Sequence, residues 1–296
     1  MPTNDAQPLV LSLFPGGGLL DYAFEQEGFC IVRGPDPLWG GDVRRFHPPA
    51  GRFDGVIGGD PCQSHSSLAN LVRAKGLEPS FPDLSPEYER VVNEARPAWF
   101  LRENVPQAPA ITPDGYDVRT FLLDNCTLDS GDGTGNEQMR RRRFWFGVRD
   151  GEAPELRAFL RFALFELDDP VQAVAGDARS VPVALGGSGR RKATSVGGRQ
   201  GHVDDLDSYK KMKSPSVTGR HHSNELRDAK VRGEGWVGLQ PRRSLEEMLR
   251  LQGLPPDWLK HQPWTMQAKR KIVGNGVPVT MGRELARAIR RVIAVR

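Results

Sequence analysis

The sequence has little cysteine and no long apolar segment. Its 296 residues include three cysteines, Cys30, Cys62 and Cys126, which form no Cys-x-x-Cys pair and no cluster with histidines. We therefore expect neither a disulfide framework nor a structural zinc site. No run of about 18 apolar residues occurs, which argues against a membrane-spanning helix, and the polar first residues lack the features of a signal peptide. These absences predict a protein of the reducing cytoplasm.

A strong overall excess of charge is also missing. Lys and Arg number 41 against 37 Asp and Glu, which gives a formal net charge of +4. The distribution is uneven, because residues 186–222 hold eight Lys or Arg and only three Asp. Such a stretch suits a surface that contacts nucleic-acid phosphates, but a solvated face would have the same composition. Charge alone leaves both interpretations open.

Short apolar runs separated by glycines and helical stretches predict an α/β protein with a doubly wound sheet. Strands are expected at residues 9–14, 29–32, 53–57, 98–101, 120–123 and 143–148. Helices are expected at residues 20–26, 86–95, from Ser244 to Gly253, and 281–295. Between the second and third strands there is room for a single helical turn at most. Residues 151–241 have no clear pattern and are interpreted as a second, smaller domain.

Two irregular segments at strand ends can support chemistry. Pro15–Gly18 is a glycine turn between a strand and a helix, the arrangement with which doubly wound folds bind nucleotides, although a tight turn without a ligand looks the same. Gly58–Ser66 presents Cys62 where the third strand ends. Asp36 and Asp42, at neighbouring strand ends, suit a ribose hydroxyl and an exocyclic amine, or simply cap turns.

Cys62 has the side chain of a nucleophile but lacks the partners found in a protease. A thiolate is a strong nucleophile at neutral pH, yet no histidine has a motif-like position, although His65 is close in sequence. An electron-poor ring is another target, because attack on C6 of a cytosine makes C5 carbanion-like. Such attack needs an acid near the ring nitrogen, which suits Glu103. It also needs a cation near the ring oxygen, which suits the run Arg140–Arg143.

The order of these motifs resembles the DNA cytosine-5 methyltransferase family, prokaryotic or phage type, over most of the chain. The segments that carry the resemblance are Phe14-Pro15-Gly16-Gly17-Gly18, Pro61-Cys62-Gln63, Glu103-Asn104-Val105, Gln138-x-Arg140-x-Arg142, Arg250-Leu251-Gln252-Gly253-Leu254-Pro255 and Gly274-Asn275-Gly276-Val277-Pro278. Any one of them could occur by chance. Six in the family's order form a specific signature.

The resemblance implies a fold and a reaction. The expected fold is a doubly wound mixed sheet of the Rossmann-like, S-adenosylmethionine-dependent type in residues 1–150, completed by residues 265–296, with a smaller irregular target recognition domain in residues 151–264. The implied activity is sequence-specific transfer of a methyl group from S-adenosylmethionine to C5 of a flipped-out cytosine. Cys62 would form a covalent adduct at C6, Glu103 would hold the ring nitrogen and amine, and no metal is required. Arg140 and Arg142 would bind the ring oxygen.

Further contacts follow from the same resemblance. The implied cofactor contacts are Phe14, Gly16, Gly18, Leu20, Asp36, Asp42, Pro61, Leu84, Asn275 and Val277. The implied DNA contacts are Gln63, Ser66, Arg73, Lys75, Arg190, Arg191, Lys192, Arg199 and Arg220. The segment Ser64–Asp83 would close over double-stranded DNA. We expect a monomer, and a cognate restriction endonuclease is a partner that the resemblance allows.

The chain departs from the family pattern at three points. Leu19 stands where the family often has another glycine, and Asp36-Pro37 stands where it has Glu and a bulky residue. Asp60 occupies a position usually filled by proline or an apolar residue. A carboxylate this close to Cys62 opposes thiolate formation unless it points away.

Two other functions fit parts of the sequence. A DNA-binding protein without activity could keep the same scaffold, but it would be free to lose Cys62, Glu103 or Arg142, and all three are present. An RNA methyltransferase is the second alternative. The tRNA-methylating branch of the family has a Cys-Phe-Thr tripeptide that this chain lacks, and Cys126 does not lie in the strand-end motif of the separate RNA cytosine family.

Overall fold

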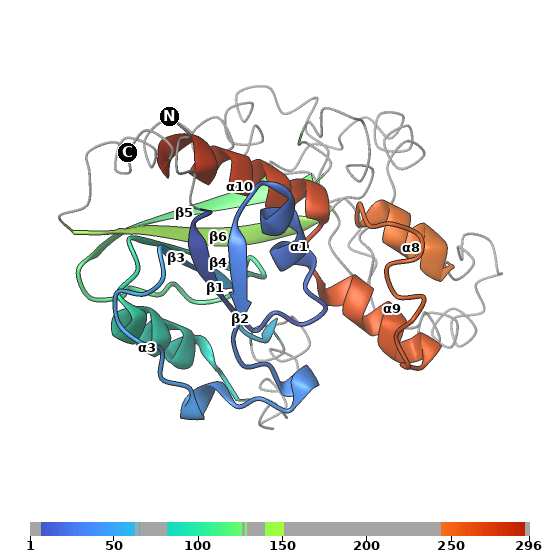
Figure 1. Ribbon diagram of the computed structural model, residues 1–296, viewed down its shortest axis with the longest axis horizontal. Helices are drawn as coiled ribbons and strands as arrows, with labels where there is room; N and C mark the ends of the chain where they lie inside the picture. The colour runs from blue at the N-terminus through green and yellow to red at the C-terminus, as the bar shows by residue number, and fades with distance from the viewer. Residues whose placement is uncertain are drawn as a thin grey trace, which may run out of the picture.

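A six-stranded mixed sheet forms the centre of the molecule (Figure 1). The computed structural model describes residues 7–62, 65, 82–125, 128, 140–150 and 244–293. The strands are β1 (Leu9–Leu13), β2 (Cys30–Arg33), β3 (Gly55–Gly58), β4 (Trp99–Asn104), β5 (Tyr116–Asp124) and β6 (Arg141–Arg149). Their order is β2-β1-β3-β4-β6-β5; the pairs β1–β2, β1–β3 and β3–β4 are parallel, and β6 runs antiparallel to β4 and β5. The predicted mixed sheet is confirmed.

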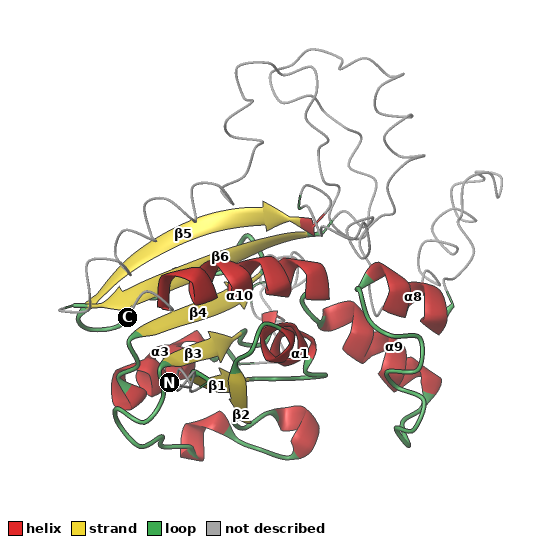
Figure 2. Cartoon of the chain, turned by 45° about the horizontal axis from the view of Figure 1, so that its top comes forward, coloured by secondary structure: helices red, strands yellow, loops and turns green. Residues whose placement is uncertain are grey.

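Helices cover both faces of this sheet (Figure 2). The described helices are α1 (Leu19–Gln26), α3 (Ser85–Ala95), α8 (Leu245–Leu251), α9 (Met266–Asn275) and α10 (Val279–Ile293), with 3₁₀ turns at Pro37–Trp39 and Val43–Arg45. The helices α1 and α10 pack on one face, and α3 packs on the other. None of the helices in the described part of the chain has the length and apolarity needed to cross a bilayer.

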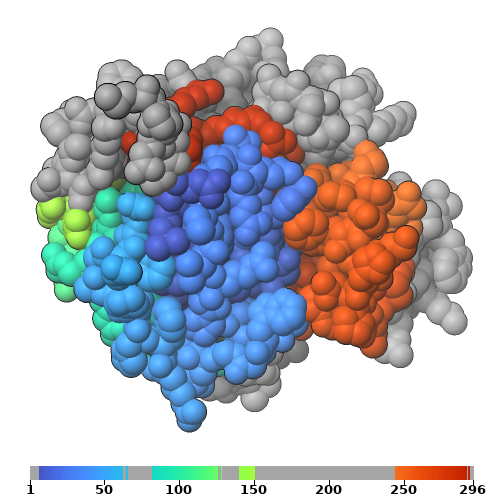
Figure 3. Space-filling view, in the orientation of Figure 1, coloured from blue at the N-terminus to red at the C-terminus, as the bar shows by residue number. Residues whose placement is uncertain are grey.

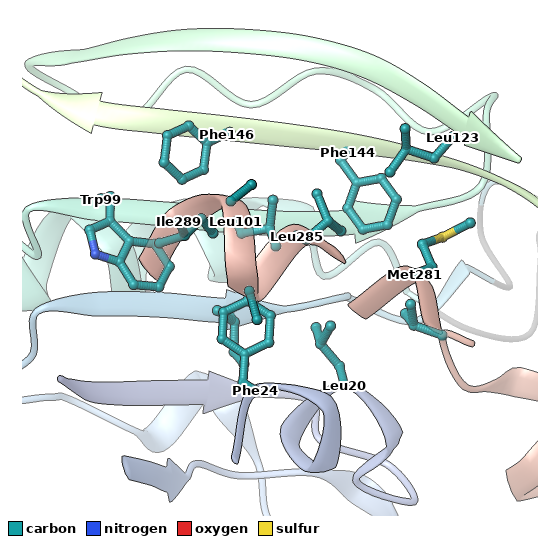
Figure 4. Packing of buried hydrophobic residues seen from close by; sticks show 14 of the residues in the cluster. Leu20, Phe24, Trp99, Leu101, Leu123, Phe144, Phe146, Met281, Leu285 and Ile289 are labelled. Atoms are coloured by element: carbon teal, nitrogen blue, oxygen red, sulfur yellow. The ribbon is translucent and has the colours of Figure 1, made fainter. Parts of the chain in front are cut away.

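The two faces are built by the strict alternation of side chains along the strands. On β4, Trp99 and Leu101 point toward α1 and α10, whereas Phe100 points toward α3. Figure 4 shows Trp99 and Leu101 beside Leu285 and Ile289 of α10. These two α10 residues are four positions apart, so they lie on one stripe of the helix as its sequence predicted. The same alternation sends the side chains of the next two residues of β4, Arg102 and Glu103, to opposite faces of the sheet.

A third apolar cluster joins the C-terminal helices to the N-terminal half. Met248 and Leu249 of α8 and Val273 of α9 pack with Leu19 and Ala23 of α1, and Figure 3 shows this orange segment against the blue one. The predicted cap of α8 is present, since Ser244 Oγ accepts a hydrogen bond from the Glu247 amide at 3.0 Å. The residues from 244 to 264 therefore share a core with the sheet domain, although the predicted boundary assigned them to the recognition domain.

The topology leaves a crevice at the carboxyl ends of the central strands. From β1 the chain passes through α1 to β2 on one side, and then returns to β3 on the other side of β1. In open α/β sheets, ligands bind outside the carboxyl ends of the strands at such a switch point. The connection from β2 to β3 contains two single 3₁₀ turns and no longer helix, as expected.

Candidate active site

A cavity of about 740 Å³ opens at the carboxyl ends of β1, β3 and β4. Of the ten predicted cofactor residues, nine line it, and they are Phe14, Gly16, Leu20, Asp36, Asp42, Pro61, Leu84, Asn275 and Val277. Three of the four predicted catalytic residues, Cys62, Glu103 and Arg142, line the same space. Gly18 and Arg140 are not among the lining residues.

The glycine turn forms one wall of the cavity. Gly16 and Gly18 have φ angles of 56° and 76°, in the left-handed region that favours glycine. Phe14 also has a positive φ, of 53°, which is unusual for a residue with a side chain and typical of functional sites. Gly18 is the N-cap of α1, and its amide donates to the Pro15 carbonyl at 2.7 Å. Gly18 therefore turns the chain into α1 and does not itself line the cavity.

The segment after β2 holds this turn in place. The carboxylate of Asp36 accepts hydrogen bonds from the amides of Gly16, at 2.9 Å, and Leu38, at 2.6 Å. The indole of Trp39 donates to the Gly16 carbonyl at 3.0 Å. Asp36, expected from the sequence to bind a ribose, thus also builds the turn. Each carboxylate oxygen has a second acceptor position, so this scaffold role leaves room for a ligand hydroxyl.

Asp42 and Asp21 supply two further carboxylates. Asp42 forms a two-point ion pair with Arg44, at 2.9 and 3.0 Å, and this hydrogen-bonded partner lowers the pKa of its carboxyl. Sequence reasoning missed Asp21, which lines the cavity from the first turn of α1. It accepts from Ser12 Oγ at 2.5 Å and from Arg33 Nε at 2.8 Å. Burial raises the pKa of the Asp21 carboxyl in spite of these donors.

The end of α9 packs against the glycine turn and lines the cavity beside it, and sequence reasoning missed this helix. Lys271 and Ile272 of α9 line the cavity. A Cβ on Gly17 would overlap with the Ile272 side chain, and one on Gly276 would overlap with Leu19. Both glycines are therefore needed for α9 to approach the turn. A usable signal was Thr265, whose side chain caps α9 by accepting from the Ala268 amide at 3.2 Å.

An ion pair between Glu103 and Arg142 also lines the cavity. Glu103 Oε1 is 2.8 Å from Arg142 Nε, and both side chains are largely buried. The loop that carries Cys62 packs closely on this pair, because a Cβ on Gly59 would lie 2.8 Å from Glu103 Oε2. The structure therefore brings the predicted nucleophile, acid and cation together, although they come from three separate segments of the chain.

Arg140 makes contacts that the sequence did not predict. Its guanidinium is buried and donates to the carbonyls of Asn275, at 3.2 Å, and Gly276, at 2.8 Å. It thus ties the start of β6 to the segment between α9 and α10. Its charge still acts on Cys62 and Glu103. A direct contact of Arg140 with a ring oxygen remains a prediction.

The environment of Cys62 favours the protonated thiol. The residue opens onto the cavity, but the surrounding protein desolvates the sulfur, and this burial together with the charge of Glu103 raises the pKa of the thiol. Arg142 and Arg140 act in the opposite direction. Burial also raises the pKa of Glu103, against the pull of Arg142. Both groups are therefore held toward their neutral forms.

These opposing charges predict that two substitutions shift the reactivity of Cys62 in opposite directions. In Glu103→Gln, the loss of a negative neighbour should lower the pKa of Cys62. In Arg142→Gln, the loss of a positive neighbour should raise it. The rate of alkylation by iodoacetamide, measured across pH and followed on the Cys62 peptide by mass spectrometry, reports the thiolate. Shifts of the same sign in both variants would contradict this electrostatic account.

Asp60 does not act on Cys62 in the way its sequence position suggested. Its carboxylate is buried and paired with Arg102, and the two atoms Asp60 Oδ2 and Arg102 Nη2 are 3.0 Å apart. The residue therefore points away from the thiol, toward the face of the sheet that α3 covers. The carboxylate that raises the pKa of Cys62 is Glu103.

The predicted DNA contacts lie outside the described residues, so their role stays a prediction. They are Gln63, Ser66, Arg73, Lys75, Arg190, Arg191, Lys192, Arg199 and Arg220.

Comparison with known proteins identifies the family. Residues 40–291 match the model of the C-5 cytosine-specific DNA methylase family. The type II methyltransferase M.NgoPII of Neisseria gonorrhoeae is 26% identical in an alignment of 344 positions, gaps included. The alignment covers 99% of this chain and 98% of that protein. The type II methyltransferase M.MthTI of Methanothermobacter thermautotrophicus is 27% identical over 336 residues, covering 95% and 97%.

Solved structures agree on the fold. A triple mutant of Spodoptera frugiperda DNMT2 matches with a TM-score of 0.52 at 12% identity, covering 96% of this chain and 99% of that one. The Dnmt2 methyltransferase of S. pombe matches with a TM-score of 0.51 at 13% identity, covering 98% and 99%. The family match covers most of the chain and includes Cys62, Glu103 and Arg142. This chain belongs to the C-5 cytosine-specific DNA methylase family and is a DNA cytosine-5 methyltransferase with S-adenosylmethionine as its methyl donor.

Proposed function

We propose that the enzyme methylates a cytosine turned out of duplex DNA, through a transient covalent bond between Cys62 Sγ and C6 of the base. The observation that carries this proposal is the shared cavity. Cys62, Glu103 and Arg142 line it together with the glycine turn and its carboxylates. A methyl donor held at the turn and a base held at Cys62 would therefore meet in one enclosed space.

The cavity fits S-adenosylmethionine by size and by chemistry. Its volume of about 740 Å³ lies in the upper part of the range for ligand sites. Asp36 and Asp42 offer acceptors for hydroxyl and amine groups, whereas Leu84 and Val277 offer apolar walls for a flat ring. When bound, S-adenosylmethionine supplies an electrophilic methyl group.

The chain's own residues prepare the base. The sulfur of Cys62 gives an electron pair to C6, and the π electrons of the C5–C6 bond move to C5. Glu103, whose pKa is raised by burial, is the acid for the ring nitrogen and takes up the developing charge. Arg142, held by its ion pair with Glu103, balances charge on the ring oxygen. After C5 has gained the methyl group it loses its proton, and elimination breaks the C6–S bond and frees the thiolate.

Sequence specificity is the second part of the proposal. We assign base recognition to the part of the predicted target recognition domain that precedes Ser244, and phosphate contacts to its basic stretch. The names of the type II relatives support a place in a restriction–modification system, with a cognate endonuclease acting on the same site. A monomer that binds one duplex is the simplest assembly. Confinement to the cytoplasm agrees with the scarcity of cysteine.

A direct test uses the purified protein with tritiated S-adenosylmethionine. Duplex DNA of mixed sequence should gain label at cytosine C5, and tRNA should gain none. Bisulfite sequencing of plasmid DNA from an expressing host should then show one short methylated sequence. Label in tRNA alone, or no label in either substrate, would overturn the proposal.

A further inference from the structure

A buried network of charged and polar groups lies behind Cys62, on the face of the sheet opposite Glu103. The side chains of Asp60 and Arg102 are both completely buried. Arg102 Nε donates to Asp60 Oδ1 at 2.5 Å, and Arg102 Nη2 donates to Asp60 Oδ2 at 3.0 Å. A two-point ion pair of this kind fixes orientation as well as distance.

The pair is embedded in further hydrogen bonds. Asn104 Nδ2 donates to Asp60 Oδ2 at 3.0 Å and to the Asp60 carbonyl at 3.1 Å. Ser85 Oγ donates to Asp60 Oδ2 at 3.0 Å and accepts from Arg102 Nη2 at 2.7 Å. Arg102 also donates to the Pro109 carbonyl at 2.7 Å. Asp60 is therefore tied to β4 through two side chains and to the start of α3 through a third.

The chain on the other side of Cys62 is anchored at the same place. The amide of His65 donates to the Cys62 carbonyl at 3.0 Å, which closes a turn. The imidazole Nε2 of His65 lies 3.0 Å from Asp83 Oδ1 and 3.3 Å from Ser85 Oγ. Ser85 thus contacts groups from both flanks of the nucleophile, so the turn is held at two points.

A cation site is the other interpretation of this cluster, since ligand atoms of Asp60, His65 and Asp83 lie within 4.8 Å of one another. The bonding of Asp60 argues against it. Its two carboxylate oxygens already accept four hydrogen bonds, two of them from the charged Arg102. The charge of the carboxylate is balanced within the protein by Arg102, and three of the four donors converge on Oδ2.

We propose that the Asp60–Arg102 ion pair is a positioning device that sets the place of Cys62 relative to Glu103. Arg102 and Glu103 are neighbours on β4, so their side chains point to opposite faces of the sheet. One strand therefore presents the catalytic acid on one face and anchors the nucleophile's loop from the other. A misplacement of about 1 Å can slow a reaction roughly 100-fold, which gives such an anchor a large effect. The inference rests on the proposed role of Cys62 as nucleophile.

The test measures covalent capture of duplex DNA that contains 5-fluorocytosine at the methylated site. Fluorine at C5 blocks the loss of a proton, so the Cys62 adduct accumulates and its rate of formation can be followed. Asp60→Asn keeps the size and removes the charge. We expect the rate of adduct formation, normalised to the concentration of S-adenosylmethionine-binding sites, to fall about 100-fold. The Kd for S-adenosylmethionine, measured by calorimetry, should change less than about threefold.

Asp60→Asn leaves the buried charge of Arg102 without its partner, which can prevent folding. A second variant is therefore needed. The double variant Asp60→Asn, Arg102→Gln has no uncompensated charge in the network. We expect it to fold and to form the adduct at least about tenfold more slowly than wild type, because a neutral pair holds the loop less firmly. Wild-type adduct rates in either variant, with normal binding of S-adenosylmethionine, would overturn the inference.

Glu27→Gln is the matched control. Glu27 pairs with Arg283 and Arg287, at 2.8 and 3.0 Å, between α1 and α10 and outside the cavity lining. Its loss should lower the melting temperature and leave the adduct rate per binding site unchanged. A slowed rate in this control would mean that general destabilisation explains the Asp60 result. If wild-type protein itself forms no adduct, the proposed nucleophile fails first, and the two failures can be told apart.

Discussion

Replacement of Cys62 by serine should abolish methyl transfer, with a loss of about 10⁴-fold or more. A serine hydroxyl stays protonated and is a far weaker nucleophile than a thiolate, so C6 would not be attacked. The environment increases this effect, because burial beside Glu103 already opposes ionisation of the group at this position. Binding of S-adenosylmethionine should change little, since most of the cavity lining is untouched.

Three measurements on one preparation check this expectation. Tritium transfer to duplex DNA reports turnover, capture on 5-fluorocytosine DNA reports the adduct, and calorimetry reports cofactor affinity. Cys30→Ser is the matched control, because Cys30 is exposed on the edge strand β2 and does not line the cavity. Retention of normal turnover by Cys62→Ser would refute the nucleophile, whatever the affinity for S-adenosylmethionine.

Glu103→Gln should give the second largest loss, of about 10²- to 10⁴-fold in turnover. Glutamine can donate a hydrogen bond to the ring nitrogen but cannot transfer a proton to it. The change also removes the charged partner 2.8 Å from Arg142 Nε, which loosens the cation. Single-turnover methyl transfer and adduct formation should slow together, because both depend on attack at C6.

Glu94→Gln provides a surface comparison for this variant. Glu94 pairs with Arg90 at 2.7 Å on α3 and lies outside the cavity lining, so its loss should leave turnover unchanged. If Glu103→Gln lowered affinity for DNA without slowing the single-turnover step, Glu103 would be a binding group and not the catalytic acid.

The same variant should alter the pH dependence of stability. Burial raises the folded-state pKa of Glu103 above its ordinary value of 4.5. Between the ordinary pKa and the raised one, the folded state binds more protons than the unfolded state, so the free energy of unfolding falls as pH rises through that window. Glutamine does not titrate, so Glu103→Gln removes this pH-dependent fall in the free energy of unfolding. The melting temperature of the wild type should therefore fall relative to that of the variant as pH rises above the ordinary carboxyl range.

Much of the fold followed from local patterns. Five of the expected strands appear within a few residues of their predicted bounds, and α1, α3, α8 and α10 do as well. The strand β5 is the least accurate, because Tyr116–Arg119 alternate exposed and half-buried residues on an edge strand and give little apolar signal. The helix α9 was missed. Its residues Lys269–Lys271 are charged, and only its last turn packs into a core.

The sequence alone determined which chemical groups this protein has and in what order. The sequence was sufficient to recognise the thiol, the acid, the arginines and two glycine-bearing turns. Each of them lies within a short segment with a conformational requirement of its own. Only the tertiary structure decided their partners. Alternation places Arg102 and Glu103 on opposite faces of β4, yet nothing local indicates that Arg102 meets Asp60, 42 positions earlier. The local sequence also gives no indication that Arg140 ties β6 to Gly276. Such pairings arise where strands and helices pack, and packing depends on the whole chain.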